Sequence, residues 1–306
     1  MLVNESGRPK QTLGVLTLDG NWLSDCSFSR PSPTESPMLL EPVSPKSALP
    51  LRDADASPPE DLPRGDEMDA KLDKVTRRLG ELQQLLYADG RHSVLVVLQG
   101  RDASGKDGVV RTVFDACNPQ GVHVTSFKAP TAIELSHDYL WRIHNDVPEN
   151  GIFGIFNRSH YEDVLVVRVH NLVPKSVWSR RYRQINDFER ILSENGVVIL
   201  KFFLHVSRAA QRERLIERIN DPAKNWKFKA ADLDERNLWT AYTDAYRDAL
   251  RKCSTKWAPW YVVPSDRNKA RNYLIAKRIV ATLEGLNLSY PEPKTDLKQY
   301  LKTLGA

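Results

Sequence analysis

The sequence predicts a three-layer α/β domain built on a parallel five-stranded sheet. Five short segments are expected to be strands, and segments of helical periodicity lie between them. Four of the five are almost entirely apolar, as strands buried on both faces are. The first of the five, Val94–Leu98, leads into a glycine-rich loop and then into a helix, an order typical of phosphate-binding α/β domains. Strands and helices that alternate in this way place helices on both faces of one sheet.

Residues 1–50 are predicted to be a disordered extension that precedes the domain. Ten of the nineteen prolines lie within residues 1–66, together with many serines and acidic residues. Closely spaced prolines prevent a long helix or a central strand, and a segment of this composition buries little apolar surface. We therefore assign residues 51–290 to the folded domain and residues 291–306 to a C-terminal tail.

The overall composition excludes several classes of protein. Hydrophobic residues make up 41% of the 306, enough for a packed core, but no apolar run approaches the roughly 18 residues of a membrane helix. The first residues lack the basic and apolar regions of a secretory signal, and three distant cysteines show no metal-binding spacing. We expect a cytoplasmic protein with reduced cysteines and no membrane partner.

Charge is unevenly distributed along the chain. The net charge is +5, but residues 1–66 hold six Lys or Arg against ten Asp or Glu, so the remainder carries +9. A folded part with this excess of positive charge suggests a polyanionic partner, either nucleic acid or another phosphate polymer.

Apolar periodicity indicates the remaining elements. Leucines and a valine recur at three- and four-residue steps along residues 68–88, which is one face of a helix that we expect to pack on the sheet or on a second subunit. Helices are also expected from the glycine loop to residue 118 and at residues 132–145, 175–195, 233–252 and 267–286. The other expected strands are Val122–Phe127, Gly151–Phe156, Val197–Leu204 and Trp260–Val263.

The glycine-rich loop, Gly100–Lys106, has the spacing G-x-x-x-x-G-K of a phosphate-binding P-loop. Its glycines permit a tight turn, and the loop N–H groups with the following helix N-terminus would stabilise an anion beside the charge of Lys106. A chance glycine-rich turn is the alternative. Asp107 replaces the Ser or Thr that usually ligates Mg²⁺, and a second carboxylate, Asp102, lies inside the loop, so we expect Mg²⁺ to depend on a carboxylate.

Polar residues follow two more of the expected strands. Ligands of open α/β sheets bind at the carboxyl ends of strands, so Lys128 is a candidate phosphate contact, with a solvated surface lysine as the alternative. Asn157 closes the third strand where P-loop enzymes have an acid that helps to hold Mg²⁺, and Arg158 beside it is placed to meet a phosphate. His160 is either a ligand or, as a lone histidine more often is, structural.

A strongly basic segment follows the fourth strand. Residues 208–229 hold seven Lys or Arg, and Asp221-Pro222 interrupts their helical pattern. One interpretation is a solvated helix face with i,i+4 ion pairs. The other is a mobile basic lid that closes over phosphates and excludes water, and the position after the fourth strand of a P-loop fold favours it. We assign this lid to about residues 208–232.

Taken together, these segments resemble the polyphosphate kinase 2 family. The matching stretches are Gly100–Gly108, Phe127–Thr131, Phe156–Asp163, Asp221–Phe228 and Ala258–Pro264, in the order expected of the family. The resemblance implies a P-loop kinase fold related to thymidylate kinase, with a helical lid. It also implies reversible transfer of a terminal phosphoryl group between inorganic polyphosphate and nucleotides with Mg²⁺. Residues 157–163 are similar to those of the branch that phosphorylates AMP as well as ADP.

The resemblance also implies roles for single residues. Asp102 would bind Mg²⁺ and orient the acceptor phosphate, Lys106 would bridge the donor and acceptor phosphates, and Glu162 would lie beside the acceptor. With Arg158, these residues form the predicted catalytic set. The predicted phosphate- and nucleotide-binding set is Gly100, Ala103, Ser104, Gly105, Asp107, Gly108, Lys128, Asn157, Arg218 and Lys227. Arg101 departs from the branch, in which an apolar residue such as Met is expected.

Two other functions stay open at this point. An ATP-dependent nucleoside-monophosphate kinase would have the same fold, and a nucleic-acid-binding P-loop ATPase would also have a basic surface. The basic residues cluster in the lid segment rather than among stacking aromatics, which argues against nucleic acid as the partner. The expected partners are inorganic polyphosphate, ADP, AMP and ATP, and we expect a homo-oligomer, either a dimer or a tetramer.

Overall fold

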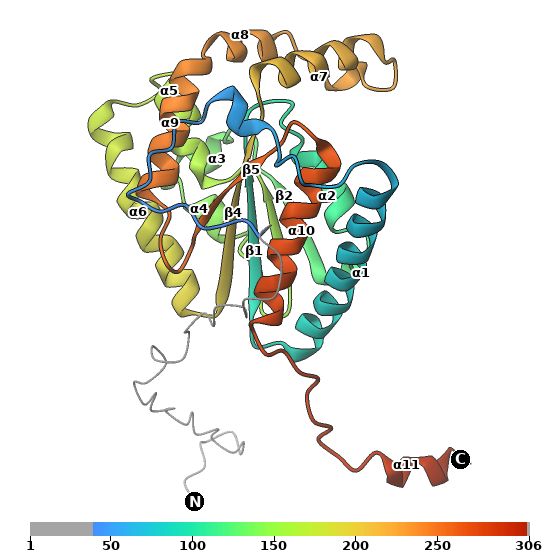
Figure 1. Ribbon diagram of the computed structural model, residues 1–306. Helices are drawn as coiled ribbons and strands as arrows, with labels where there is room; N and C mark the ends of the chain where they lie inside the picture. The colour runs from blue at the N-terminus through green and yellow to red at the C-terminus, as the bar shows by residue number, and fades with distance from the viewer. Residues whose placement is uncertain (1–38, 305–306) are drawn as a thin grey trace, which may run out of the picture. The chain divides into compact units, whose positions relative to one another are not determined.

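The structure of the protein, a computed structural model, describes residues 39–304. Five parallel strands form one sheet in the order β2-β3-β1-β4-β5 (Figure 1). The strands are β1 (Ser93–Gln99), β2 (Val122–Ser126), β3 (Phe153–Asn157), β4 (Val197–His205) and β5 (Trp260–Pro264). The parallel five-stranded sheet predicted from the sequence is therefore confirmed.

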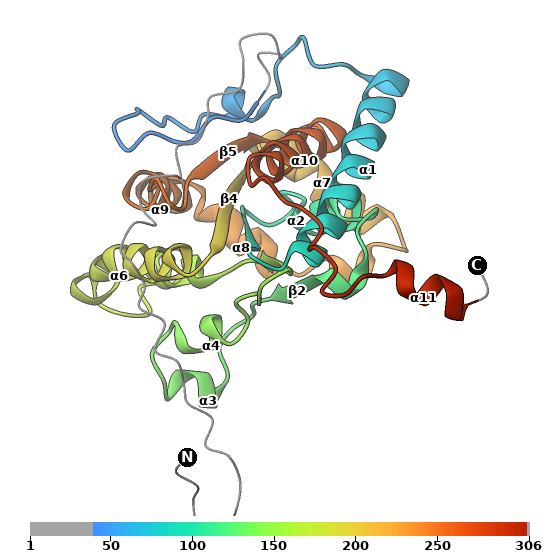
Figure 2. The same ribbon diagram turned by 90° about the horizontal axis from the view of Figure 1, so that it is seen from below.

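Long helices cover both faces of the sheet, as Figure 1 and Figure 2 show. One face carries α1 (Gly65–Asp89), α2 (Lys106–Val113) and α10 (Asn268–Glu284), and the other carries α6 (Lys175–Glu194) and α9 (Trp239–Lys252). The side chains of β1 divide between the two resulting cores: Val94, Val96 and Leu98 enter the first, and Leu95 and Val97 enter the second. Burial on both faces explains why this strand is continuously apolar in the sequence.

Shorter elements connect these helices and strands. The other α-helices are α3 (Ala132–Leu135), α4 (Trp141–His144), α5 (Val166–Val169), α7 (Arg208–Asn220), α8 (Ala231–Asn237) and α11 (Lys298–Thr303). The 3₁₀-helices are η1 (Asp53–Ala56), η2 (Pro119–Gly121), η3 (His160–Asp163) and η4 (Asn225–Lys227). The segment from α7 to α8 lies across the carboxyl ends of the strands, in the place predicted for a lid (Figure 1).

The single helix expected at residues 132–145 is instead two short helices, α3 and α4. Thr131 and Glu134 form a capping box that starts α3, but the helix ends after one turn. The Asp138 side chain then accepts a hydrogen bond from the N–H of Leu140 at 2.9 Å. Such a local side-chain bond competes with helical hydrogen bonding, which the apolar periodicity of the segment does not reveal.

Residues 39–50, which the sequence placed in the extension, lie against the domain. The N–H of Val43 donates to the carbonyl oxygen of Trp260 at 2.8 Å, and Nε of Arg247 donates to that of Leu49 at 2.8 Å. The side chains of Val43 and Leu51 are buried. Prolines exclude a helix here but allow an extended segment. The boundary that we inferred from composition, between residues 50 and 51, is therefore too close to the C-terminus. The predicted disorder of residues 1–38 lies outside the described residues.

No helix within residues 39–304 is both long enough and apolar enough to cross a membrane.

Candidate active site

A cavity of about 970 Å³ opens at the carboxyl ends of the strands, between the phosphate loop (residues 100–106), the lid and α9. All of the residues predicted for the site line this cavity except Ser104, which is fully buried within the loop. The lining residues from the prediction are Gly100, Asp102, Ala103, Gly105, Lys106, Asp107, Gly108, Lys128, Asn157, Arg158, Glu162, Arg218 and Lys227. Residues from five separate segments of the sequence therefore meet at one place.

The phosphate loop has a backbone path that requires its glycines. Gly105 is in the left-handed region with a φ of +99°, and a Cβ at this position would collide with Nη1 of Arg271. A Cβ on Gly100 would lie 2.8 Å from the carbonyl oxygen of Leu204, at the end of β4. Both positions are therefore restricted to glycine, the first by φ and by space and the second by space.

Lys106 is the buried cation at the end of the loop. Its Nζ donates to the carbonyl oxygens of Gly100 at 2.7 Å and Arg101 at 3.2 Å. Burial lowers the pKa of this ammonium to about 8, and the charge of Arg158 adds to the effect, while Asp102 opposes it. Because no carboxylate of residues 39–304 is hydrogen-bonded to Lys106, an anion that enters the cavity would restore the charge stabilisation lost on burial.

Arg158 connects the loop to the segment after β3. Its Nη2 lies 2.7 Å from Oδ1 of Asp102, and its Nη1 lies 3.5 Å from Oε2 of Glu162. The backbone of Arg158 has a φ of +65°, and its N–H donates to the carbonyl oxygen of Leu98 at the end of β1. A left-handed, non-glycine residue at this point turns the chain so that the guanidinium and both carboxylates lie in the cavity.

The carboxylates of the cavity suit a divalent cation whose remaining ligands come from the substrate and water. Among the described residues, no group of three or more His, Cys, Asp or Glu side chains is placed to hold a metal ion. The Asp102 side chain is 25% exposed, and Asp107 Oδ1 accepts a hydrogen bond from Asn157 Nδ2 at 2.9 Å. Mg²⁺ in phosphoryl-transfer sites commonly takes one or two carboxylates, with phosphate oxygens and water as the other ligands. Asp102 and Asp107 fit that use.

The lid contacts the phosphate loop directly. Gln211 Nε2 donates to the carbonyl oxygen of Asp102 at 3.0 Å, and Nη1 of Arg214 donates to that of Ala103 at 2.9 Å. Farther along the lid, Arg218 forms a 3.4 Å ion pair with Asp232, which joins α7 to α8. The basic segment is therefore not a helix face turned only to solvent, and its side chains form one wall of the cavity.

An aromatic wall forms another part of the cavity, and the sequence analysis did not predict it. It consists of Trp239, Tyr242 and Tyr246 from α9, with Leu165 and Val166 from the segment after η3. These aromatic residues lie on the same side of α9, within a segment that the sequence analysis expected to be helical without assigning it a role in the site.

Arg101 points into this aromatic wall. Its guanidinium lies 4.0 Å from the ring centroid of Trp239, and its Nη2 donates to Thr243 Oγ1 and to the carbonyl oxygen of Trp239. Only 7% of the residue is exposed. The basic residue found where the family branch has an apolar one therefore packs the loop against the start of α9.

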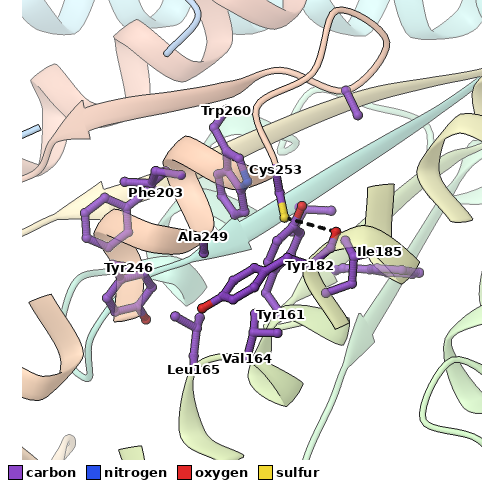
Figure 3. Packing of buried hydrophobic residues seen from close by; sticks show 14 of the residues in the cluster. Tyr161, Val164, Leu165, Tyr182, Ile185, Phe203, Tyr246, Ala249, Cys253 and Trp260 are labelled. Carbon is purple, nitrogen blue, oxygen red and sulfur yellow. Dashed lines mark hydrogen bonds between the residues drawn. The ribbon is translucent and has the colours of Figure 1, made fainter. Parts of the chain in front are cut away.

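A buried polar network supports the segment that carries Arg158 and Glu162. Nζ of Lys201, on β4, binds Glu189 of α6 and donates to the Tyr161 hydroxyl at 2.8 Å. Nε2 of His160 lies 3.2 Å from Glu189 Oε1, and all four side chains are fully buried. Figure 3 shows Tyr161 surrounded by apolar residues from α6, β4, β5 and α9. His160 is therefore part of the structural support of η3.

Comparison with known proteins identifies close relatives. The sequence profile of the family described as "Polyphosphate kinase 2 (PPK2)" matches residues 64–290. An AMP/ADP-polyphosphate phosphotransferase of Meiothermus ruber is 58% identical over 221 residues, which cover 72% of this chain and 83% of that protein. An ADP-polyphosphate phosphotransferase of Rhodopseudomonas palustris is 51% identical over 227 residues, 70% of this chain and 78% of that protein.

A solved structure shows the same similarity. The crystal structure of polyphosphate kinase 2 from Arthrobacter aurescens TC1 matches with a TM-score of 0.79 and 40% sequence identity, over 86% of this chain and 91% of that chain.

Proposed function

The chain belongs to the polyphosphate kinase 2 family, and we propose that it transfers the terminal phosphoryl group of inorganic polyphosphate to ADP and AMP. One observation carries the proposal: the phosphate loop, the basic lid and an aromatic wall line the same cavity. Phosphoryl transfer needs its donor and acceptor held in line in a site that excludes water. A basic surface suits a polyanionic donor, and an aromatic surface suits the nucleoside of the acceptor.

The donor chain would follow the basic side chains of the cavity. Lys227 and Arg218 come from the lid, Lys128 follows β2, and Lys106 ends the loop. Lys128 is exposed, and its carbonyl oxygen is held by Nη1 of the buried Arg142 at 2.9 Å, so its backbone is fixed while its ammonium is free to meet a phosphate. A series of separate cations can bind a repeating phosphate chain by charge alone, without a pocket for a base.

The acceptor phosphate would bind between Asp102, Arg158 and Glu162. Arg158 provides the positive charge, and the two carboxylates that pair with it set its position. Lys106 would lie between donor and acceptor and neutralise the charge of the transferred group. Glu162 would limit how much negative charge the acceptor can bring and so influence the choice between a mono- and a diphosphate. In phosphoryl transfer, positioning and charge neutralisation of this kind supply most of the rate.

Asp102 and Asp107, which both line the cavity, would hold Mg²⁺ at this place. When bound, the ion neutralises charge on the phosphate oxygens of both substrates. Asn157 holds Asp107 by a hydrogen bond, and the other residues of the site orient the phosphates.

The test is to supply long-chain polyphosphate and Mg²⁺ with either AMP or ADP, without ATP, and to separate the nucleotides by chromatography. New ADP or ATP is the expected product. If polyphosphate gives no product while ATP phosphorylates AMP, the protein is a nucleoside-monophosphate kinase and the proposal is wrong. ATP hydrolysis that DNA or RNA stimulates would instead favour the nucleic-acid-binding ATPase.

Two further expectations remain predictions of the sequence. Light scattering tests the homo-oligomer, either a dimer or a tetramer, and fractionation of cells tests the cytoplasmic location.

A further inference from the structure

The carbonyl oxygens of the phosphate loop are bound by side chains. Lys106 binds those of Gly100 and Arg101, and Gln211 binds that of Asp102. Nη1 of Arg214 donates to the carbonyl oxygens of Ala103 at 2.9 Å and Ser104 at 3.3 Å, and Nη1 of Arg271 donates to that of Ser104 at 3.2 Å. Since buried backbone groups require partners, these side chains decide which way the carbonyls of the loop turn.

The orientation of the carbonyls fixes that of the N–H groups. In a planar trans peptide the C=O and the following N–H point in opposite directions. Arg214 and Arg271 bind the carbonyl of Ser104, so the N–H of Gly105 points the other way. Within residues 39–304, the N–H groups of Ala103 and Gly105 donate to no protein acceptor. They are therefore available to a phosphate in the cavity that the loop lines.

Arg271 is a fixed support on the face of the sheet. It extends from α10, is only 2% exposed and fills the space that a Cβ on Gly105 would need. Its remaining hydrogen bonds go to the side-chain oxygens of Asn268 and Asn272. Burial, followed by the neighbouring charge of Arg214, lowers the pKa of Arg271 to about 9. The guanidinium is thus held by several hydrogen bonds, and none of its partners within residues 39–304 is a carboxylate.

Arg214 supplies the same contact from a different part of the structure. It lies on α7, the first helix of the lid, and its Nη2 also donates to the carbonyl oxygens of Ser265 and Asp266 after β5. One side chain thus joins the lid, the phosphate loop and the end of the sheet. A displacement of α7 would remove this support from the carbonyls of Ala103 and Ser104.

We propose that Arg271 and Arg214 are positioning residues that hold the phosphate loop in its anion-binding conformation, Arg271 from α10 and Arg214 from the lid. Neither needs to touch the transferred phosphate. This proposal rests on the proposed function only in that the loop binds phosphate. It follows that loop order depends on lid position, because Arg214 is bound to the loop only when α7 lies against it.

The decisive variant is Arg271→Lys, which keeps the charge but loses the planar fork of donors. We expect kcat to fall by about tenfold or more while the KM for AMP changes by less than about threefold, because a small misplacement of reacting groups reduces the rate more than binding. Arg214→Lys should show the same pattern. Arg180→Lys, on α6, exposed and outside both the lid and the cavity, is the matched control and should behave as the unmodified protein.

The measurements use whichever phosphoryl donor the unmodified protein accepts, so a wrong donor assignment would not affect the comparison. Binding of tripolyphosphate, followed by calorimetry, should weaken in both variants and not in the control. An unchanged kcat in Arg271→Lys, or a loss of activity that matches only the loss of folded protein in a thermal melt, would overturn the proposal. If Arg271→Lys does not fold, Arg214→Lys decides the question by the same two measurements.

Discussion

Replacing Lys106 by Met should abolish most phosphoryl transfer without unfolding the protein. The ammonium is buried and, within the part of the chain that the structure describes, is bonded only to two carbonyl oxygens. Burial brings its pKa from 10.5 to about 8. A change of that size means that burial destabilises the charged form of Lys106 by about 3 kcal/mol in the free protein. A bound phosphate would restore this stabilisation. Loss of one preorganised electrostatic donor commonly costs about 10²–10³-fold in kcat, or about 3–4 kcal/mol. The two magnitudes agree.

Stability should respond differently from activity in this variant. Because the free protein holds the ammonium at an energetic cost, an apolar replacement removes that cost while it leaves the carbonyls of Gly100 and Arg101 without a donor. We expect these effects to offset each other and the thermal midpoint to change little. Initial rates with saturating substrates and a thermal melt measure the two quantities, with Lys74→Met, an exposed lysine of α1, as the control. Near-normal turnover in folded Lys106→Met would refute the assignment of the loop.

Three other perturbations test separate parts of the structure. The pKa of Lys106 in the free protein is about 8, and a bound phosphate raises it. Binding of tripolyphosphate should therefore be coupled to proton uptake by Lys106 near pH 8 and should weaken as the pH rises above that value. Calorimetry in buffers of different ionisation enthalpy measures the uptake. Lys201→Met leaves Glu189 charged and buried, so it should lower the free energy of unfolding, measured in urea, by about 3–5 kcal/mol. Adding Glu189→Gln should recover part of that loss. Equal stability of Lys201→Met and the unmodified protein would show that the ion pair does not contribute to stability. The KM for polyphosphate should rise steeply with salt, and Lys227→Ala should raise it more than it raises the KM for the nucleotide. An equal rise of both constants would show that polyphosphate does not bind along Lys227.

Local sequence patterns predicted the frame of the fold and much of the cavity. The apolar run of β1, followed by glycines and Lys106, indicates a strand, a loop and a helix from adjacent residues of the sequence alone. The family resemblance read from the same stretches is confirmed by the comparisons. Residues that follow β3 and β4 meet in the cavity because parallel strands end at one edge of the sheet.

Contacts between distant segments could not be predicted in this way. Arg271 binds the carbonyl of Ser104 across 167 positions of the sequence, and nothing in the periodicity of α10 distinguishes it from a surface arginine. The position of Arg101 over Trp239 likewise depends on how α9 returns to the loop after the lid. Sequence patterns indicate which residues form an element, but the partner of a buried charge is decided by packing in three dimensions.

The donor is the central claim, and the most direct measurement follows both products of one reaction. A polyphosphate of defined length is mixed with AMP, Mg²⁺ and the protein, and ³¹P NMR records the chain length while chromatography records the nucleotides. We predict that the chains shorten by one phosphate for each phosphoryl group gained by the nucleotide, with little free orthophosphate released. The account would be contradicted if the polyphosphate kept its length and AMP were phosphorylated only after ATP was added.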